Sequence, residues 1–300
     1  MIVDLNSMIL ENEIRITQDV DWLTNMWKTA HDAGLLEVSF WASIGDPSIT
    51  YNVSDMMILG SKLYVTITDG SLLIYSIDGG GWERVVLGYT PNCMASIGAD
   101  IYIGCFHRVL RYATGTGILT DIGSVVASDP LTENVYTIAA IGSKIYCGGV
   151  FDSIDGVAMT GVAEYDAIGD AWSDIGGGGT NALGMISDGS NLYAGIGTKI
   201  RKWNGSSWND LGTSPVTVST VLCFAVYGTD LLMGCSSGDH LYIWDGSAWA
   251  SFGGGVSGSV RDIGVYLTDV YVVGNLTTEG NYVARYSGGS WWSLDTGLNA

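Results

Sequence analysis

Three histidines and 31 carboxylates are the residues of this 300-residue chain best suited to catalysis or metal binding. His31, His107 and His240 are far apart, and none has the short spacing to another histidine or to a Cys-x-x-Cys pair that zinc sites use. No serine lies in the G-x-S-x-G pattern of a hydrolase nucleophile. We therefore expect no metal, no cofactor and no enzymatic activity. A glycosidase needs only two carboxylates, so a carbohydrate-active enzyme stays as the less favoured alternative.

The five cysteines form two matched pairs and one remainder. Cys93 and Cys105 are twelve residues apart across a Gly-Ala turn, and Cys223 and Cys235 are twelve apart across a Gly-Thr turn. In antiparallel hairpins both pairs would lie almost opposite each other, which makes cross-strand disulfides geometrically possible. Because no export signal is visible, we favour free thiols. Cys147 has no evident partner and is expected in the core.

The chain is strongly acidic. Its 12 Lys and Arg residues and 31 Asp and Glu residues give a formal charge of -19, which would repel nucleic-acid phosphates and anionic lipid surfaces. No segment has the roughly 18 uninterrupted apolar residues of a membrane helix. The start, MIVDLNSMILENEIRITQD, lacks the basic and apolar regions of a signal peptide. We expect no nucleic-acid partner, no membrane insertion, and synthesis in the cytoplasm without Sec export.

A short aromatic hairpin recurs along the sequence. LYIWDGSAWASFGGG at 241–255 has near copies in KIRKWNGSSWNDLGT at 199–213 and YVARYSGGSWWSLDTG at 282–297. The aromatic rings of such a hairpin could form a flat shelf for a sugar, or they could fill the space between packed sheets. A sugar site needs one or two shelves, whereas the Trp-led strand is found in five copies, so we favour packing.

The hairpin belongs to a longer repeat of 38 to 47 residues. Each copy has an apolar strand, a tight turn, a second strand with an anchor residue, a third strand and a fourth strand that usually begins with Trp. This period and strand number predict an all-β fold, a propeller of six four-stranded blades at about 54–297 within a domain of residues 37–300. The anchors are Tyr64, Tyr102, Tyr146, Tyr193, Leu232 and Tyr271, and the fourth-strand residues are Trp82, Leu119, Trp172, Trp208, Trp249 and Trp291.

The third repeat has a more specific pattern. IYCGGVFDSIDGVAMTGVAEYDAIGDAWSDIGGG at 145–178 contains the double glycine Gly148-Gly149, followed by a Tyr and then a Trp. It resembles the repeats of kelch-like and galactose-oxidase-type propellers. That resemblance implies a propeller over most of residues 54–297, of a kind that serves as a scaffold for protein interaction, lectin-like binding or catalysis. One fold hosts many functions, so the resemblance supports fold more than function.

The long loops are expected on one face of the propeller. The first-to-second and third-to-fourth strand turns are minimal and share one face, whereas the second-to-third loops and the blade connections share the other. The long segments 123–135, 151–159, 212–219 and 275–281 all fall on this second face. Variable loops on a rigid scaffold are a common place for binding sites. Our candidate ligand-face residues are Asp129, Glu133, Phe151, Asp152, Asp155 and Glu279.

Residues 1–36 lack the blade pattern. The stretch DVDWLTNMWKTAHDAG predicts a short amphipathic helix, capped by Asp19 and ended by Gly34. The segment is expected either to dock the propeller on another chain or to plug its own surface. Residues 37–46, EVSFWASIGD, copy the Trp-led fourth strand and predict a spare outer strand that covers an edge or belongs to a partial extra blade. The apolar helix face consists of Trp22, Leu23, Met26 and Trp27.

Together these patterns favour a non-catalytic structural or adhesion protein that presents a loop-rich face to a protein or a glycan. An acidic propeller behind an N-terminal docking segment resembles, in organisation, virion proteins of tailed phages, such as tail, fibre or head-decoration components. This resemblance implies partner subunits in a larger assembly, and location in a virion or an extracellular assembly. A free lectin-like carbohydrate-binding module is the alternative.

Overall fold

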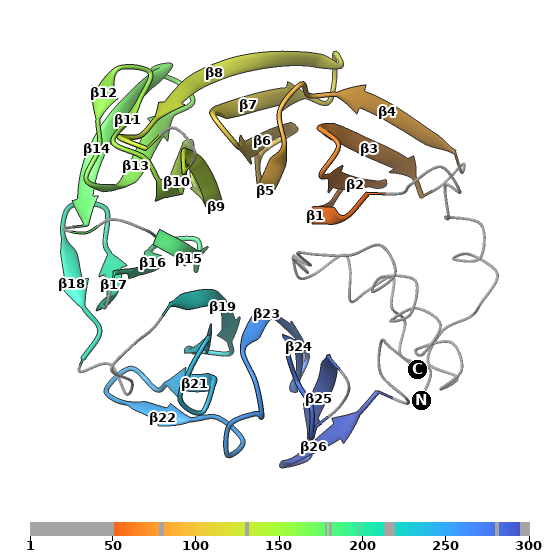
Figure 1. Cartoon of the computed structure of the whole chain (residues 1–300), viewed down its shortest axis with the longest axis vertical. Coiled ribbons are helices and arrows are strands. Elements are labelled where there is room, and N and C mark those ends of the chain that lie inside the picture. The colour runs from red at the N-terminus through yellow and green to blue at the C-terminus, as the bar shows by residue number, and fades with distance from the viewer. Residues whose placement is uncertain are drawn as a thin grey trace.

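The computed structural model describes residues 51–77, 81–129, 132–177, 179, 182–197, 199–212, 220–279 and 282–294. This part contains strands and turns without a helix, arranged as a six-bladed β-propeller (Figure 1). The all-β, six-bladed prediction is therefore confirmed. The predicted helix in residues 1–36 and the predicted strand 37–46 lie outside the described residues. Within the described part, no helix is long and apolar enough to cross a membrane.

Every blade contains four antiparallel strands whose order follows the chain. Blade 1 is β1 (Val53–Leu59), β2 (Lys62–Ile67), β3 (Ser71–Ser76) and β4 (Trp82–Val86), and blade 2 is β5 (Pro91–Ile97), β6 (Asp100–Cys105), β7 (Arg108–Ala113) and β8 (Ile118–Val126). Blade 3 is β9 (Asn134–Ile141), β10 (Lys144–Val150), β13 (Gly161–Asp166) and β14 (Ala171–Gly177), and blade 4 is β15 (Ala182–Ser187), β16 (Leu192–Ile196), β17 (Lys199–Trp203) and β18 (Trp208–Asp210). Blade 5 is β19 (Val221–Tyr227), β20 (Asp230–Cys235), β21 (Leu241–Trp244) and β22 (Trp249–Ser251), and blade 6 is β23 (Val260–Tyr266), β24 (Asp269–Gly274), β25 (Val283–Ser287) and β26 (Ser290–Ser293).

The first two strands of each blade are joined by the tight turns that the sequence predicts. Gly98 and Gly228 occupy two of these turns with φ of 58° and 64°, a left-handed conformation that glycine adopts without steric cost. The anchor residues lie on the second strands. Four of them are buried between blades, whereas Tyr193 and Tyr271 are partly exposed. Tyr102 and Leu232, for example, are almost completely buried. The glycine turns and the alternation of side chains along the strands thus both predict the blade that is observed.

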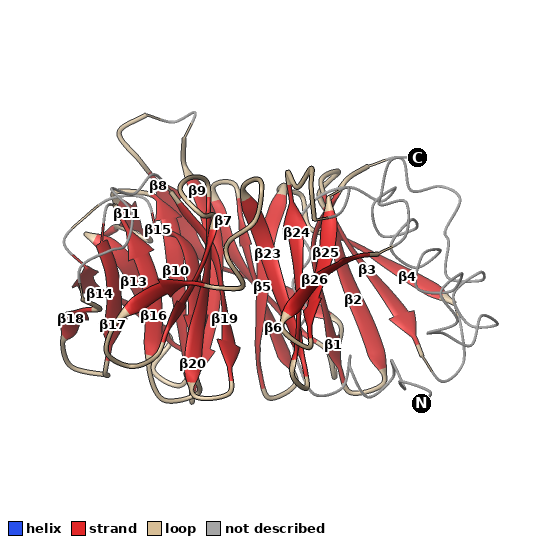
Figure 2. Ribbon diagram, turned by 90° about the horizontal axis from the view of Figure 1, so that it is seen from below, coloured by secondary structure: helices blue, strands red, loops and turns tan. Residues whose placement is uncertain are grey.

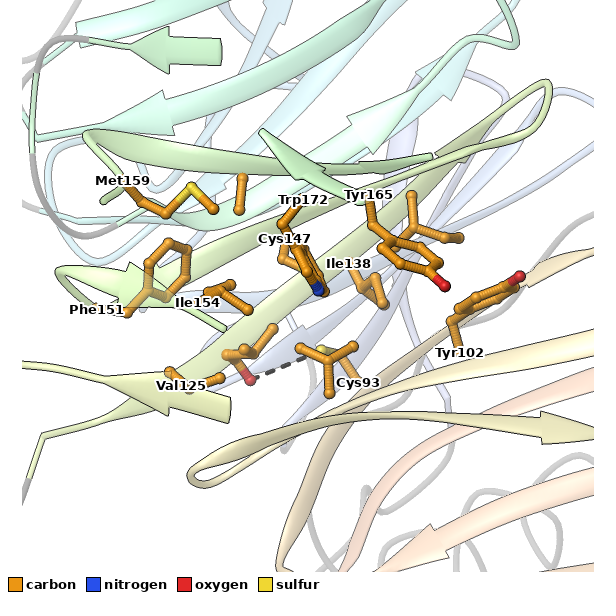
Figure 3. Packing of buried hydrophobic residues seen from close by; sticks show 14 of the residues in the cluster. Cys93, Tyr102, Val125, Ile138, Cys147, Phe151, Ile154, Met159, Tyr165 and Trp172 are labelled. Atoms are coloured by element: carbon orange, nitrogen blue, oxygen red, sulfur yellow. Dashed lines mark hydrogen bonds between the residues drawn. The ribbon is translucent and has the colours of Figure 1, made fainter. Parts of the chain in front are cut away.

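Side chains on the two faces of a blade pack on different neighbours. Successive residues of a strand point to opposite faces, so each blade has a preceding face, toward the blade before it in the chain, and a following face, toward the next one. Five apolar clusters fill the five contacts between consecutive blades 1 to 6. The largest lies between blades 2 and 3 and includes Tyr102, Ile138, Cys147 and Trp172 (Figure 3). A single blade has no closed core, so stability depends on blade stacking.

A β-bulge interrupts the pairing of the first two strands in all six blades. It leaves one residue of the innermost strand without a cross-strand partner. The register on either side of the bulge is shifted by one residue, which reverses the face of every side chain beyond it. The bulged residues are Ser54, Asn92, Tyr136, Leu183, Leu222 and Arg261.

The register of each hairpin places its two cysteines on opposite faces of the sheet. Cys93 pairs with Gly104, whereas Cys105 pairs with Pro91. Cys93 packs in the core between blades 2 and 3, and Cys105 packs on the other face of its sheet, between blades 1 and 2. Cys223 and Cys235 are divided in the same way. The disulfides considered from the spacing are therefore ruled out by geometry, and the expectation of five free, buried thiols is confirmed.

The fourth-strand tryptophans link successive blades. The indole N–H of Trp208 in blade 4 donates to the carbonyl oxygen of Ile175 in blade 3 at 2.9 Å, and its ring packs on Trp203 with centroids 5.5 Å apart. We call this hydrogen bond the tryptophan latch. The same latch joins Trp172 to Ile122, Trp249 to Leu211, and Trp291 to Gly253, over distances of 2.6 to 3.0 Å. The packing interpretation of these recurrent aromatic residues is confirmed.

Candidate binding site on the loop face

Five of the six candidate residues come from two neighbouring loops above blades 2 and 3. One loop connects β8 to β9, and the other connects β10 to β13. We name the described residues 127–129, 132–133 and 151–160 the loop ridge. Figure 2 shows the β8–β9 connection rising well above the strands. Glu279 lies apart from the ridge, in the β24–β25 loop of blade 6 (Figure 1).

A small hairpin fixes the loop ridge to both blades. Its strands are β11 (Ser153–Ile154) and β12 (Val157–Ala158), which belong in sequence to blade 3. β11 pairs with β8, so the hairpin extends the sheet of blade 2 from four to six strands. The amides of Asp152 and Asp155 donate to the carbonyl oxygens of Val126 and Ser124, both at 2.8 Å. The loop is therefore fixed to blade 2 by main-chain pairing.

Phe151 supports this hairpin from below. Its ring is 7% exposed and packs with Met159 and Ile154 in the core between blades 2 and 3 (Figure 3). The expectation that Phe151 faces a ligand is therefore corrected. An aromatic side chain in a loop can serve as the loop's own anchor, and irregular backbone gives no alternation from which to predict its direction.

Glu133 is also buried, and it organises the β8–β9 connection. One carboxylate oxygen is hydrogen-bonded to Nδ1 of His107, and the other accepts from the amide of Ala127 at 3.1 Å. His107 has a φ of 68°, which is uncommon for a residue with a side chain, and its ring contacts that of Phe106. His107 thus belongs to the loop face through its contact with Glu133. His107 directly precedes the third strand of its blade, as His240 (φ 63°) does in its own blade. This shared position is the feature of the sequence from which His107 could have been selected.

The other acidic residues of the ridge are exposed. Asp152 accepts a hydrogen bond from the hydroxyl of Ser128, which ties the two loops together. Asp155 lies at the tip of the hairpin with a φ of 51°. The main-chain carbonyl of Asp129 accepts from the amide of Thr132 at 3.0 Å in a tight turn. The ridge therefore presents three carboxylates, Asp129, Asp152 and Asp155, on a braced backbone.

Glu279 fastens a different loop. Its carboxylate accepts from the amide and the hydroxyl of Ser257 at 3.0 and 2.6 Å, and from the hydroxyl of Thr278 at 2.9 Å. Partial burial would raise the pKa of Glu279, but these hydrogen bonds outweigh it and lower the pKa below its ordinary value. The residue joins the β24–β25 loop to the connection that leads into blade 6.

Beside the hairpin, at the outer rim, lies a groove of about 530 Å³ that the sequence does not reveal. Asp121, Asp155 and Asp170 line it together with Tyr165 and Trp172. The hydroxyl of Tyr165 donates to Oδ1 of Asp170 at 2.5 Å. Among the described residues, no group of His, Cys, Asp or Glu is arranged to hold a metal ion. We call this the rim groove; its carboxylates can accept hydrogen bonds from hydroxyl groups.

Comparison with known proteins supports the fold. No family model matches the chain, and no curated protein matches it. The extracellular domain of BT4673 from B. thetaiotaomicron has a TM-score of 0.57 and 14% identity over 73% of this chain and 31% of that one. BamB from Moraxella catarrhalis has a TM-score of 0.55 and 13% identity over 81% of this chain and 73% of that one. The computationally designed Ika8 protein has 0.57 and 13% over 79% and 71%.

These structural similarities show that the chain has an architecture found in proteins of very different sequence. At such low identity they show the β-propeller fold alone. The chain spans about a third of the length of the BT4673 chain that it matches. A kelch-like origin gains no support from them, and the function has to be inferred from the molecule's own surface.

Proposed function

We propose that this propeller is a non-catalytic binding protein that contacts a partner protein through the loop ridge. The observation that carries the proposal is the β11–β12 hairpin, which leaves blade 3 and is hydrogen-bonded to blade 2. A loop fixed across two blades loses little conformational entropy when it binds. The hairpin is thus suited to recognition by a preformed surface.

The chemistry of the ridge indicates the kind of partner. Val157 of the ridge is 38% exposed, and Val126, the last residue of β8, is 46% exposed. They give apolar contact area beside Asp152 and Asp155. Carboxylates around apolar side chains complement a protein surface with basic residues around an apolar patch. Incorporation of the propeller into a larger assembly, such as a phage virion or another adhesive structure, is the setting we propose for this contact.

The acids that hold the loops of this face support binding rather than catalysis. Glu133 and Glu279 hydrogen-bond the loops that carry them, so their carboxylates serve the shape of the surface. A general acid in a glycosidase instead needs a raised pKa, which burial without such donors would produce. The pKa of Glu279 moves in the opposite direction.

The partner experiment compares three forms of the intact protein: the wild type, a ridge variant (Asp155→Lys with Val157→Asp) and a control (Ile168→Asp). Ile168 lies in the β13–β14 turn and is 83% exposed. Proteins from the particle or complex of origin are captured on each form and identified by cross-linking mass spectrometry. We expect cross-links to the ridge that disappear in the ridge variant and persist in the control. Loss in the control alone, with unchanged melting temperatures, would reject the ridge as the site.

A second candidate function is glycan binding in the rim groove. It is favoured by three carboxylates beside Tyr165 and Trp172, since sugar hydroxyls bind carboxylates and sugar rings pack on aromatic side chains. A glycan array with immobilised protein tests it. Retention of one oligosaccharide class that is lost in Asp170→Ala and kept in the Ile168→Asp control would replace the first proposal. Hydrolysis of the bound oligosaccharide would favour the glycosidase alternative.

A further inference from the structure

One apolar face of the propeller has no described blade against it. Val53, Leu63, Val65, Leu73 and Tyr75 form a cluster that belongs entirely to blade 1. Every other described cluster is shared by two consecutive blades. The side chains of the blade 1 cluster are buried, with at most 7% exposure. A sheet face of this composition has to be covered, because an apolar patch that is left exposed to water is adhesive.

The register of the strands identifies this surface as the preceding face of blade 1. In blade 6, the preceding face packs on blade 5 through Val260, Val270, Val272, Ala284 and Tyr286. These positions correspond one by one to Val53, Leu63, Val65, Leu73 and Tyr75, because the cross-strand partners match: Tyr286 faces Val270 and Trp291, as Tyr75 faces Leu63 and Trp82. The face is therefore built to receive a blade-like unit.

Blade 6 offers the complementary side. In blade 1, Oδ2 of Asp55 accepts from the amide of Met94 in blade 2 at 2.6 Å, and its other oxygen accepts from the adjacent amide of Met56. Asp262 occupies the equivalent register position in blade 6, is 9% exposed and accepts from the adjacent amide of Ile263 at 2.9 Å. By the same geometry, a carboxylate oxygen of Asp262 is directed at the unit that follows blade 6.

We propose that residues 1–50 fill the position between blade 6 and blade 1 of the same chain, with residues 37–46 as the outermost strand of that unit. In the propeller, each fourth strand leads directly into the first strand of the next blade, so the segment that precedes β1 belongs at this position. In the latches of Trp172 and Trp208, the accepting residue belongs to the fourth strand of the preceding blade. It lies three residues after the Trp or Leu of that strand. FWASIGD repeats this pattern as Trp41 and Ile44. The carbonyl of Ile44 is thereby assigned as the latch acceptor for Trp82.

The chain lengths agree with this assignment. Val53 follows Ile44 by nine residues, between the seven that separate Ala182 from Ile175 and the ten that separate Val221 from Leu211. The 36 residues before the strand exceed the 24 that span β1 to β3. Their apolar side chains, Trp22, Leu23, Met26 and Trp27 among them, supply material to cover blade 1. The N-terminal segment then completes the ring instead of docking on another chain.

The experiment uses the full chain with a site-specific protease sequence in place of residues 47–50. After cleavage, native size-exclusion chromatography with light scattering measures whether fragment 1–46 remains bound. We expect co-elution at the mass of one chain, about 31.8 kDa. Two outcomes would overturn the proposal. One is release of fragment 1–46 from a propeller whose melting temperature is unchanged, and the other is co-elution at twice the mass of one chain. Either outcome means that the segment does not complete its own ring.

Two face variants and one control make the result specific to blade 1. Val65→Asp places a charge in the cluster, whereas Val86→Asp changes a residue of the same blade that is 72% exposed. We expect release of fragment 1–46 from the first variant and retention by the second. Leu73→Ala, a milder change on the same face, is used if Val65→Asp does not fold, and should weaken retention at least tenfold. Equal retention by Leu73→Ala and Val86→Asp would contradict the proposed contact.

Discussion

The indole nitrogen of Trp208 and the carbonyl oxygen of Ile175 lie 2.9 Å apart and join the outer strands of blades 4 and 3. The bond joins two sheets whose inner strands are already packed against each other. It therefore links the two blades near the rim as well. Trp208 therefore contributes both apolar contact and one hydrogen bond, and these contributions can be separated.

Trp208→Phe keeps an aromatic ring and removes the donor, which leaves the Ile175 carbonyl without its latch. We expect a loss of about 1 kcal/mol in the free energy of unfolding. Trp208→Ala also removes the ring contact with Trp203, with an expected loss of about 3 kcal/mol. Denaturant unfolding measures both. Trp292→Ala is the control, since Trp292 is 59% exposed; an equal loss in the control would show that the latch has no special weight.

The close approach of blades 5 and 6 gives a second prediction. A Cβ on Gly234 would lie 2.5 Å from Sγ of Cys223 and 2.7 Å from Cγ1 of Val260. Gly234→Ala should cost about 1–3 kcal/mol, because the inner strands of the two blades would have to separate. Gly115→Ala is the matched control, since a Cβ there has no atom within 4 Å and its φ is not positive. A melting temperature that falls equally in both variants would contradict the packing argument.

Thiol chemistry provides a third prediction. Burial raises the pKa of Cys147 and of Cys223, so neither forms a reactive thiolate near neutral pH. A thiol reagent should label none of the cysteines in the native protein. After denaturation without reductant it should label all five. Protection of four thiols in the denatured protein would establish disulfides and refute the assignment of Cys93 and Cys105 to opposite faces.

Acid should destabilise the protein through Asp188. Partial burial would raise the pKa of this carboxyl, but hydrogen bonds from Asn191, Ser190 and Tyr193 outweigh it and lower the pKa below 3.8. A lowered pKa in the folded state stabilises the fold at pH values above the unfolded pKa, and this contribution is lost as the pH falls through the folded pKa. Unfolding measured from pH 6 to pH 2.5 should show wild type more stable than Asp188→Asn above pH 3.8, with the difference shrinking below it. A constant difference across this range would contradict the linkage.

The blade pattern was predictable because its signals are local. Strand alternation, tight turns and the spacing of residues such as Tyr102 and Tyr146 each point to the same hairpins, and their repetition leaves few folds that bury all the apolar faces. The bulges were not predictable from spacing. A single extra residue at Asn92 or Leu222 reverses the face of Pro91 or Val221 relative to the cysteine on the other side of the bulge, and nothing in the local sequence distinguishes that residue from its neighbours.

The candidate site was predictable as a face and less so as individual residues. The topology brings the loops of Asp129 and Asp152 together, as loop length indicated. The burial of Phe151 and the contact between His107 and Glu133 depend on how two blades meet, which a single sequence does not encode locally. The rim groove was missed for the same reason, since Asp121 and Asp170 come from different blades.

The latch acceptors belong to the main chain, and this has an evolutionary consequence. Ile122, Leu211 and Gly253 differ in side chain, yet each offers the same carbonyl oxygen to an indole. Duplicated blades can therefore diverge at the accepting strand while only the donor is held under selection. Drift of this kind lowers the sequence similarity between blades and leaves their geometry unchanged.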